Sequence, residues 1–202
     1  MITLSIVIPI YNEQETLPFL CERLNKELSD IKKELGIHDL PGSVSQVEIL
    51  FINDGSTDHS LSIIESMAKG HGLYRYINLS RNFGHQAAVS AGIQFARGKV
   101  VIIMDGDLQD PPELIKEMIK RWKQGFDVVY AVRRKRQAKF LKNIAYKLYY
   151  KMKASISDYP AQRDSGDFSL LDRKVVDIIN KLPEKDRYMR GLRLGSALSR
   201  PV

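Results

Sequence analysis

The chain has 202 residues, of which 44% are hydrophobic, with a net charge of +7 and a single cysteine. This length and apolar content suit one α/β domain with a substantial core, and a lone cysteine excludes an intramolecular disulfide and fits a reducing compartment. No run reaches the roughly 18 consecutive apolar residues of a membrane-spanning helix, and no secretion signal precedes the first apolar run. We therefore expect a chain that faces the cytoplasm and does not cross a bilayer, although it could lie on one.

Strand-like apolar runs alternate with helical periodicity along the first 131 residues. Strands are expected at 4–10, 47–52, 74–79, 100–104 and 128–131, and helices at 15–35, 58–69, 85–97 and 112–124. Cys21 falls in the apolar stripe of the first helix. The alternation predicts a mostly parallel central sheet with helices on both faces. Because open α/β sheets bind ligands at the carboxyl ends of their strands, the segments after each strand are the candidate site.

Acidic and amide side chains follow three of these strands. The segments are Pro-Ile-Tyr-Asn-Glu at 9–13, Asn-Asp-Gly-Ser-Thr-Asp at 53–58 and Asp-Gly-Asp-Leu-Gln-Asp-Pro-Pro at 105–112. Helix capping accounts for one of Ser56, Thr57 and Asp58, and a helix start accounts for Asp110 and the two prolines that follow it. It does not account for Asp54, Asp105 and Asp107, whose carboxylates would repel one another unless a cation or sugar hydroxyls compensate them. We therefore predict a functional site at this edge.

The side chains available there favour a hard cation. Asp107 and the amide oxygen of Gln109 are ligands that suit Mg²⁺ or Mn²⁺. Structural zinc is excluded, because the single cysteine and the scattered histidines lack its spacing. We interpret each histidine as a surface or capping group: His38, His59, His71 and His85. The glycine motifs of dinucleotide-binding and P-loop enzymes are both missing after the first strand.

The positive charge is concentrated in one segment. Residues 133–153 carry nine Lys or Arg and no Asp or Glu, which leaves the rest of the chain at −2. An apolar stripe runs through the same segment, from Phe140 to Met152. The combination predicts a basic amphipathic helix that docks on anionic lipid or packs on its own core, with nucleic acid as the least favoured partner.

The motifs at 5–13 and 53–58 resemble the two donor-binding motifs of the inverting family 2 glycosyltransferases of GT-A fold. The segments 79–86 and 105–113 resemble the polyprenyl-phosphate branch, such as dolichyl-phosphate mannose synthase and bacterial undecaprenyl-phosphate glucosyltransferases. The resemblance runs to about residue 192, so we expect a catalytic domain at 1–192, including the basic segment at 133–153. The tail at 193–202 departs from the family pattern, which in many members continues into transmembrane helices.

This resemblance implies transfer of a hexose from a nucleotide-diphospho-sugar, preferably a UDP-sugar and otherwise GDP-mannose, to a polyprenyl phosphate at an anionic membrane surface. The residues that it assigns to the donor are Pro9, Tyr11, Glu13 and Asp54 at the nucleoside, Asp105 at the ribose or sugar, and Asp107 with Gln109 at Mg²⁺ or Mn²⁺. On the acceptor side it assigns Asp167, with Asp164 close by. It also places phosphate-binding arginines after the fifth strand, among Arg133, Arg134 and Arg136. Asp172 is expected to cap a helix that begins at residue 173.

Three alternatives stay open at this point. A family 2 enzyme with a saccharide or protein acceptor would need a general base, which Asp167 could supply. A truncated, non-catalytic module that binds the donor or a lipid surface is the second. A nucleotidyltransferase is the third, although the chain lacks a glycine-rich phosphate loop near its start. A nucleic-acid partner is not expected, and a homo-oligomer is left open.

Overall fold

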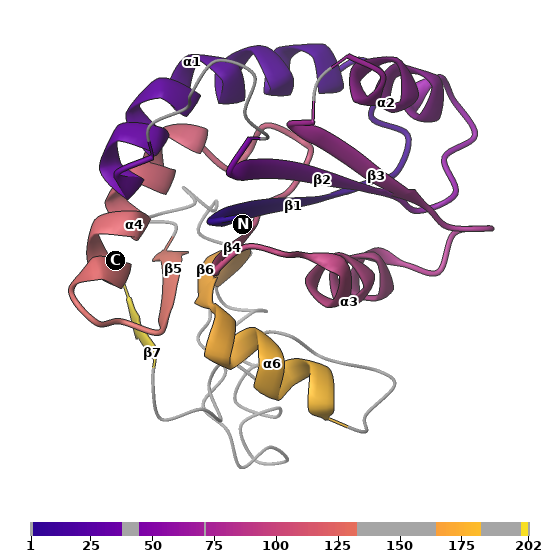
Figure 1. Cartoon of the computed structure of the whole chain (residues 1–202). Helices are drawn as coiled ribbons and strands as arrows, with labels where there is room; N and C mark the ends of the chain where they lie inside the picture. The colour runs from indigo at the N-terminus through magenta and orange to yellow at the C-terminus, as the bar shows by residue number, and fades with distance from the viewer. Residues whose placement is uncertain (1, 38–44, 71, 133–164, 183–198, 202) are drawn as a thin grey trace, which may run out of the picture.

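The computed structural model describes residues 2–37, 45–70, 72–132, 165–182 and 199–201 (Figure 1). The predicted basic amphipathic helix at 133–153, the three arginines after the fifth strand, Asp164 and most of the tail at 193–202 lie outside the described residues. Within them, no helix is both long and apolar enough to cross a membrane.

A seven-stranded sheet forms the centre of the domain. Its strands are β1 (Leu4–Ile10), β2 (Val47–Asn53), β3 (Tyr74–Asn78), β4 (Val100–Ile103), β5 (Val128–Val132), β6 (Ser165–Asp172) and β7 (Ser199–Pro201). Their spatial order is β3-β2-β1-β4-β6-β5-β7. β1 pairs in parallel with β2 and β4, β2 with β3, and β5 with β7, whereas β6 runs antiparallel to both of its neighbours. The predicted mostly parallel sheet is confirmed, with β6 as an unpredicted reversed strand.

The helices are α1 (Leu17–Leu35), α2 (Ser60–Ala68), α3 (His85–Phe95), α4 (Ile115–Lys123) and α6 (Arg173–Lys181), and a 3-10 turn at Pro112–Leu114 precedes α4. Proline and glycine residues set both ends of α1. A proline in the first turn of α1 fits its start two residues later than predicted. α1 ends at Gly36, whose φ of 70° lies in the left-handed region that favours glycine.

Helices cover both faces of the sheet, as predicted (Figure 1). On one face, α1 and α4 bury residues such as Leu24 and Ile119 against Ile6 and Phe51 of the sheet, and α2 packs there as well. On the other face, α3 and α6 pack against a second set of strand residues that includes Val7 and Leu50. Because successive side chains of a strand point to opposite faces, β1 contributes to both cores. Cys21 is buried in the first core, as its place in the apolar stripe predicted.

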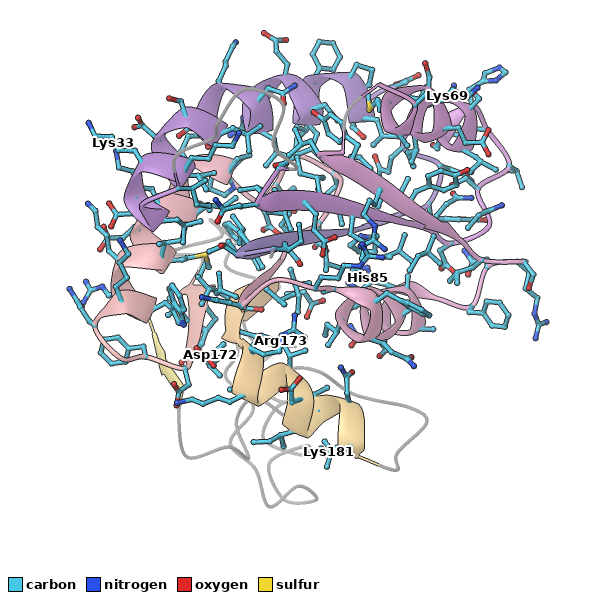
Figure 2. All side chains as sticks on the ribbon, viewed as in Figure 1. Lys33, Lys69, His85, Asp172, Arg173 and Lys181 are labelled. Atoms are coloured by element: carbon cyan, nitrogen blue, oxygen red, sulfur yellow. The ribbon has the colours of Figure 1, made fainter. Side chains whose placement is uncertain are left out.

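A close approach positions α3 on the sheet. A Cβ added at Gly92 of α3 would lie 2.2 Å from Cγ1 of Val7, so only glycine lets this helix lie so near β1. The first residue of α3 is His85, and Figure 2 shows its side chain at the edge of the sheet. α3 thereby brings its amino-terminal turn to the carboxyl ends of the parallel strands.

A buried ionic cluster lies near the amino ends of β1 and β2, away from the candidate site. Glu48 is fully buried and its carboxylate accepts hydrogen bonds from Oγ of Ser5 and from the backbone N–H of Arg97. The guanidinium of Arg75 pairs with its other oxygen. The cation and the two donors offset the cost of desolvating this buried carboxylate.

Candidate active site

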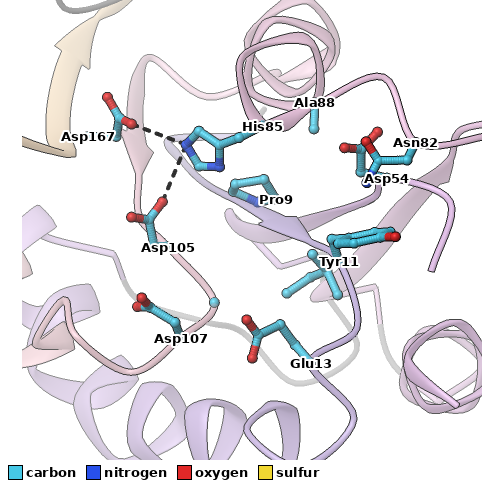
Figure 3. A pocket seen from close by; sticks show the side chains of 12 residues that line it. Pro9, Tyr11, Glu13, Asp54, Asn82, His85, Ala88, Asp105, Asp107 and Asp167 are labelled. Carbon is cyan, nitrogen blue, oxygen red and sulfur yellow. Dashed lines mark hydrogen bonds and ion pairs between the residues drawn. The ribbon is translucent and has the colours of Figure 1, made fainter. Parts of the chain in front are cut away.

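A pocket of about 360 Å³ lies at the carboxyl edge of the sheet (Figure 3). It is lined by seven residues that the sequence had assigned to the site: Pro9, Tyr11, Glu13, Asp54, Asp105, Asp107 and Asp167. Asn82 and His85 line it as well, without having been assigned. Gln109 is exposed and lies outside the lining set. The described lining residues include five carboxylates, so the pocket is strongly acidic.

The loops after β1 and β2 are interlocked beside Tyr11. Asn12 has a φ of 56°, a left-handed conformation that asparagine tolerates better than most residues. Its backbone N–H donates to Oγ of Ser56 at 3.0 Å, and its side-chain Oδ1 accepts from the backbone N–H of Thr57 at 2.8 Å. These bonds hold the Tyr11 ring, which is 47% exposed, at the mouth of the pocket.

Asp54 shapes the wall of the pocket through the backbone of the loop before α3. Its two carboxylate oxygens accept hydrogen bonds from the N–H groups of Phe83 at 2.8 Å and Gly84 at 3.0 Å. The neighbouring Gly55 packs so tightly that an added Cβ would lie 2.4 Å from the backbone carbon of Arg81. Asp54 therefore fixes the loop that presents Asn82 to the pocket.

The loop after β4 is pinned in place by three features. The backbone N–H of Asp105 donates to Oδ2 of the buried Asp110 at 3.0 Å. A Cβ added at Gly106 would lie 2.6 Å from Cδ1 of Ile10, so the loop packs directly on the end of β1. Leu108 adopts a φ of 63°, a left-handed conformation that is costly for leucine, while its side chain packs against the core of α1 and α4. The loop thus presents Asp105 and Asp107 to the same pocket (Figure 3).

The antiparallel strand β6 delivers Asp167 to the site. Ser169 of β6 pairs with Ile103 of β4. Because the two strands are antiparallel, Asp105, two residues after Ile103, lies opposite Asp167, two residues before Ser169. This position is just past the end of β4. At the other end of β6, Asp172 caps α6 as predicted, because its side chain accepts from the backbone N–H of Lys174 at 3.0 Å.

His85 lies between these two carboxylates. Its Nε2 is 3.1 Å from Oδ2 of Asp167 and 3.5 Å from Oδ1 of Asp105. Gln86, the next residue of α3, has its Nε2 3.5 Å from the same oxygen of Asp167. The interpretation of His85 as a surface or capping group missed this contact. The sequence offered one signal for this contact. His85 follows the third predicted strand at the start of a helix, and the aspartates also follow predicted strands, so both were expected at the same edge of the sheet.

Asp105 has a raised pKa and a buried carboxylate oxygen. Burial raises its pKa to about 6; His85 opposes this rise, and the nearby Asp110, Asp167 and Asp107 add to it. Its Oδ1 is buried and makes no hydrogen bond among the described residues, although Nε2 of His85 lies at ion-pair distance from it. A buried carboxylate oxygen of this kind needs a cation or a hydroxyl donor.

The carboxylates of this pocket fit a divalent cation. His85, Asp105 and Asp167 each offer a ligand atom, and these atoms lie within 4.8 Å of one another. Asp107 lines the same pocket, and its Oδ1 accepts the backbone N–H of Gln109 at 3.0 Å. Carboxylate oxygens are preferred by Mg²⁺ and Mn²⁺. An anionic ligand such as a diphosphate would be repelled by five carboxylates without a cation to neutralise them, so the arrangement suits metal-assisted binding of phosphates.

Comparison with known proteins matches the Glycosyl transferase family 2 model to residues 5–179. The chain is 43% identical over 189 residues to the uncharacterized glycosyltransferase YkcC of Bacillus subtilis, covering 93% of this chain and 55% of that protein. It is 37% identical over 190 residues to the bactoprenol glucosyl transferase of Shigella phage SfV, covering 94% and 58%. The chain therefore spans little more than half the length of these curated relatives.

Two solved structures share the fold. The mannosyltransferase PcManGT from Pyrobaculum calidifontis, in complex with GDP-Man and Mn²⁺, matches with a TM-score of 0.58 and 17% identity over 98% of this chain and 53% of that one. Glucosyl-3-phosphoglycerate synthase from Mycobacterium tuberculosis, in complex with UDP, matches with a TM-score of 0.53 and 18% identity over 86% and 58%. At these identities the likeness shows the architecture alone, and it confirms the expected GT-A fold.

Proposed function

The chain belongs to glycosyltransferase family 2, and from this premise we propose that it transfers a hexose from a nucleotide-diphospho-sugar to a polyprenyl phosphate. The observation that carries the proposal is the acidic pocket, which gathers the ends of β1, β2 and β4 with Asp167 of β6. The 37% identity to a bactoprenol glucosyl transferase supports a polyprenyl phosphate as the acceptor. As the donor we propose a UDP-sugar in preference to GDP-mannose.

In this proposal the nucleoside binds on the side of the pocket formed by Pro9, Tyr11 and Asn82. The exposed ring of Tyr11 offers an apolar surface on which a base or ribose can pack. Asp54 supports this side indirectly, because both of its oxygens are engaged by the loop before α3. Glu13, which also lines the pocket, completes the nucleoside side.

The diphosphate and sugar occupy the side formed by Asp105 and Asp107. We assign Asp107 and Gln109 as ligands of Mg²⁺ or Mn²⁺ and Asp105 as the residue that faces the ribose or sugar. A cation held there would neutralise the charge that builds on the departing nucleoside diphosphate. The buried Oδ1 of Asp105 makes no hydrogen bond among the described residues, which supports a ligand on this side.

The acceptor phosphate approaches from the side of Asp167. One of its oxygens forms a bond to the anomeric carbon of the sugar as the bond from that carbon to the diphosphate breaks, and the nucleoside diphosphate leaves with the electron pair. Attack from the opposite face inverts the anomeric carbon. Little general-base help is needed, because a phosphate monoester is already ionised near neutral pH. Arg133 and Arg136 are proposed to meet the phosphates.

The proposed setting is the cytoplasmic face of a membrane. We assign residues 1–192 as the catalytic domain and the basic segment at 133–153 as its contact with anionic lipid. The carrier is a membrane lipid, so a peripheral domain has to approach the bilayer to reach its phosphate.

A transfer assay tests the proposed function. Radiolabelled UDP-glucose or GDP-mannose is incubated with the chain and undecaprenyl phosphate in detergent, with Mg²⁺, with Mn²⁺ or with EDTA. We expect label in the lipid phase only when a cation is present, with the preferred donor identified by the label. Label on an added saccharide instead would support the saccharide acceptor, and donor binding without any transfer would support a non-catalytic module.

A further inference from the structure

Two carboxylates face each other at the end of β4 because β6 runs antiparallel to it. The pairing of Ile103 with Ser169 puts Asp105 opposite Asp167 two residues further on. One oxygen of each lies within 4.8 Å of the other. Asp167 is only 2% exposed, whereas the side chain of Asp105 is 26% exposed, so water screens the pair from the side of Asp105 only. Like charges placed directly opposite each other across strands are destabilising.

His85 occupies the position that relieves this repulsion. Its Nε2 lies at hydrogen-bonding distance from Asp167 and at ion-pair distance from Asp105. An ionised carboxylate only accepts hydrogen bonds, so where both aspartates are ionised this nitrogen has to carry the hydrogen. Among the described residues that line the pocket, His85 is the only one whose side chain can become positively charged.

We propose that His85 is a positioning residue that holds Asp105 and Asp167 together and thereby orients Asp167 toward the acceptor side of the pocket. The rigid placement of α3, through Gly92 against β1 and through Asp54 at Gly84, fixes where the imidazole lies. Gln86 adds a second donor to Asp167 from the same turn of the helix. Asp107 lies on the same side of the pocket (Figure 3) and stays available for a cation.

A double-mutant cycle, measured by thermal unfolding of the 202-residue chain, tests the contact of His85 with the two aspartates without relying on activity. The variants are His85→Ala, Asp105→Asn and the double variant, each unfolded thermally in EDTA. We expect His85→Ala to lower the thermal midpoint by about 3–8 °C, since it removes the imidazole that lies between the two facing carboxylates. In the Asp105→Asn background, His85→Ala should lower the thermal midpoint by less than half as much, because an amide at position 105 no longer repels the carboxylate of Asp167. An equal loss in both backgrounds, or no loss at all, would overturn the proposal.

Two further variants separate positioning from packing. His85→Gln keeps an N–H donor, so its thermal midpoint should be close to that of the wild type. His59→Ala removes an exposed histidine at the start of α2 and should leave the midpoint unchanged. A midpoint as low for His85→Gln as for His85→Ala would contradict the proposal.

The second readout rests on the proposed function. In the transfer assay, His85→Ala should lower kcat by about 10- to 100-fold while the KM for the nucleotide sugar changes by less than about threefold, and His85→Gln should recover most of kcat. An unchanged kcat in His85→Ala would contradict the orienting role. A wild-type chain that transfers no sugar would count against the proposed function alone, and the unfolding cycle would then decide on His85.

Discussion

Asp54→Asn should destabilise the fold through the loop before α3. Asp54 is 3% exposed, and its carboxylate accepts hydrogen bonds from the N–H groups of Phe83 and Gly84. An amide in its place has one oxygen, so it can accept one of these bonds and sets an NH₂ group against the other donor. A hydrogen bond to a charged group contributes about 1.5–3 kcal/mol, and a buried donor left unsatisfied costs about 1–3 kcal/mol. We therefore expect the free energy of unfolding to fall by roughly 2–4 kcal/mol.

Urea unfolding followed by circular dichroism measures this loss. Glu15→Gln is the matched control, because it makes the same chemical change on an exposed carboxylate and should alter stability by less than about 0.5 kcal/mol. Asp54→Asn should also weaken nucleotide-sugar binding, since the loop that carries Asn82 loses its anchor. A variant that unfolds at the same urea concentration as the wild type would refute the role given to Asp54.

Three further predictions concern other parts of the molecule. Asp107→Asn should lower metal-dependent transfer by at least ~100-fold while leaving the thermal midpoint nearly unchanged, as measured by the transfer assay and calorimetry. Glu48→Gln should lower the free energy of unfolding by about 3–5 kcal/mol in urea, because it breaks the buried cluster with Arg75, while donor affinity stays the same. The folded-state pKa of Asp105, about 6, lies above its ordinary value of 3.8, so this group destabilises the fold as pH rises from about 4 to beyond 6. In EDTA, Asp105→Asn should therefore lose less stability than the wild type over that pH range, and parallel pH profiles would contradict this reasoning.

The five predicted strands were recognisable because each is a largely apolar run bounded by turn residues, although Glu48 interrupts β2 and Arg75 interrupts β3. β1 has the predicted bounds, and the bounds of the other four differ by one residue. Helix ends were less predictable, since capping and the 3-10 turn at Pro112–Leu114 shorten them. β6 was missed because Ser165, Gly166 and Asp167 interrupt its apolar pattern. Its pairing with β4 also joins segments far apart in the chain.

The candidate site also has a part that the sequence predicted and a part that it did not. The rule that ligands bind at the carboxyl ends of parallel strands was enough to predict that Asp54, Asp105 and Asp107 would share one edge. The environment of His85 could not be predicted by that rule, because its two carboxylate neighbours come together only when β6 reverses direction. The basic segment at 133–153 stays a prediction, because it lies outside the described residues.

The central claim is that the acidic pocket binds a nucleotide sugar with the help of a divalent cation. Isothermal titration of the chain with UDP-glucose and GDP-mannose, with Mn²⁺ or with EDTA, tests it most directly. We predict that one of the two donors binds with Mn²⁺ and that EDTA abolishes this binding. Failure of both donors to bind in Mn²⁺, or equal binding in EDTA, would contradict the account.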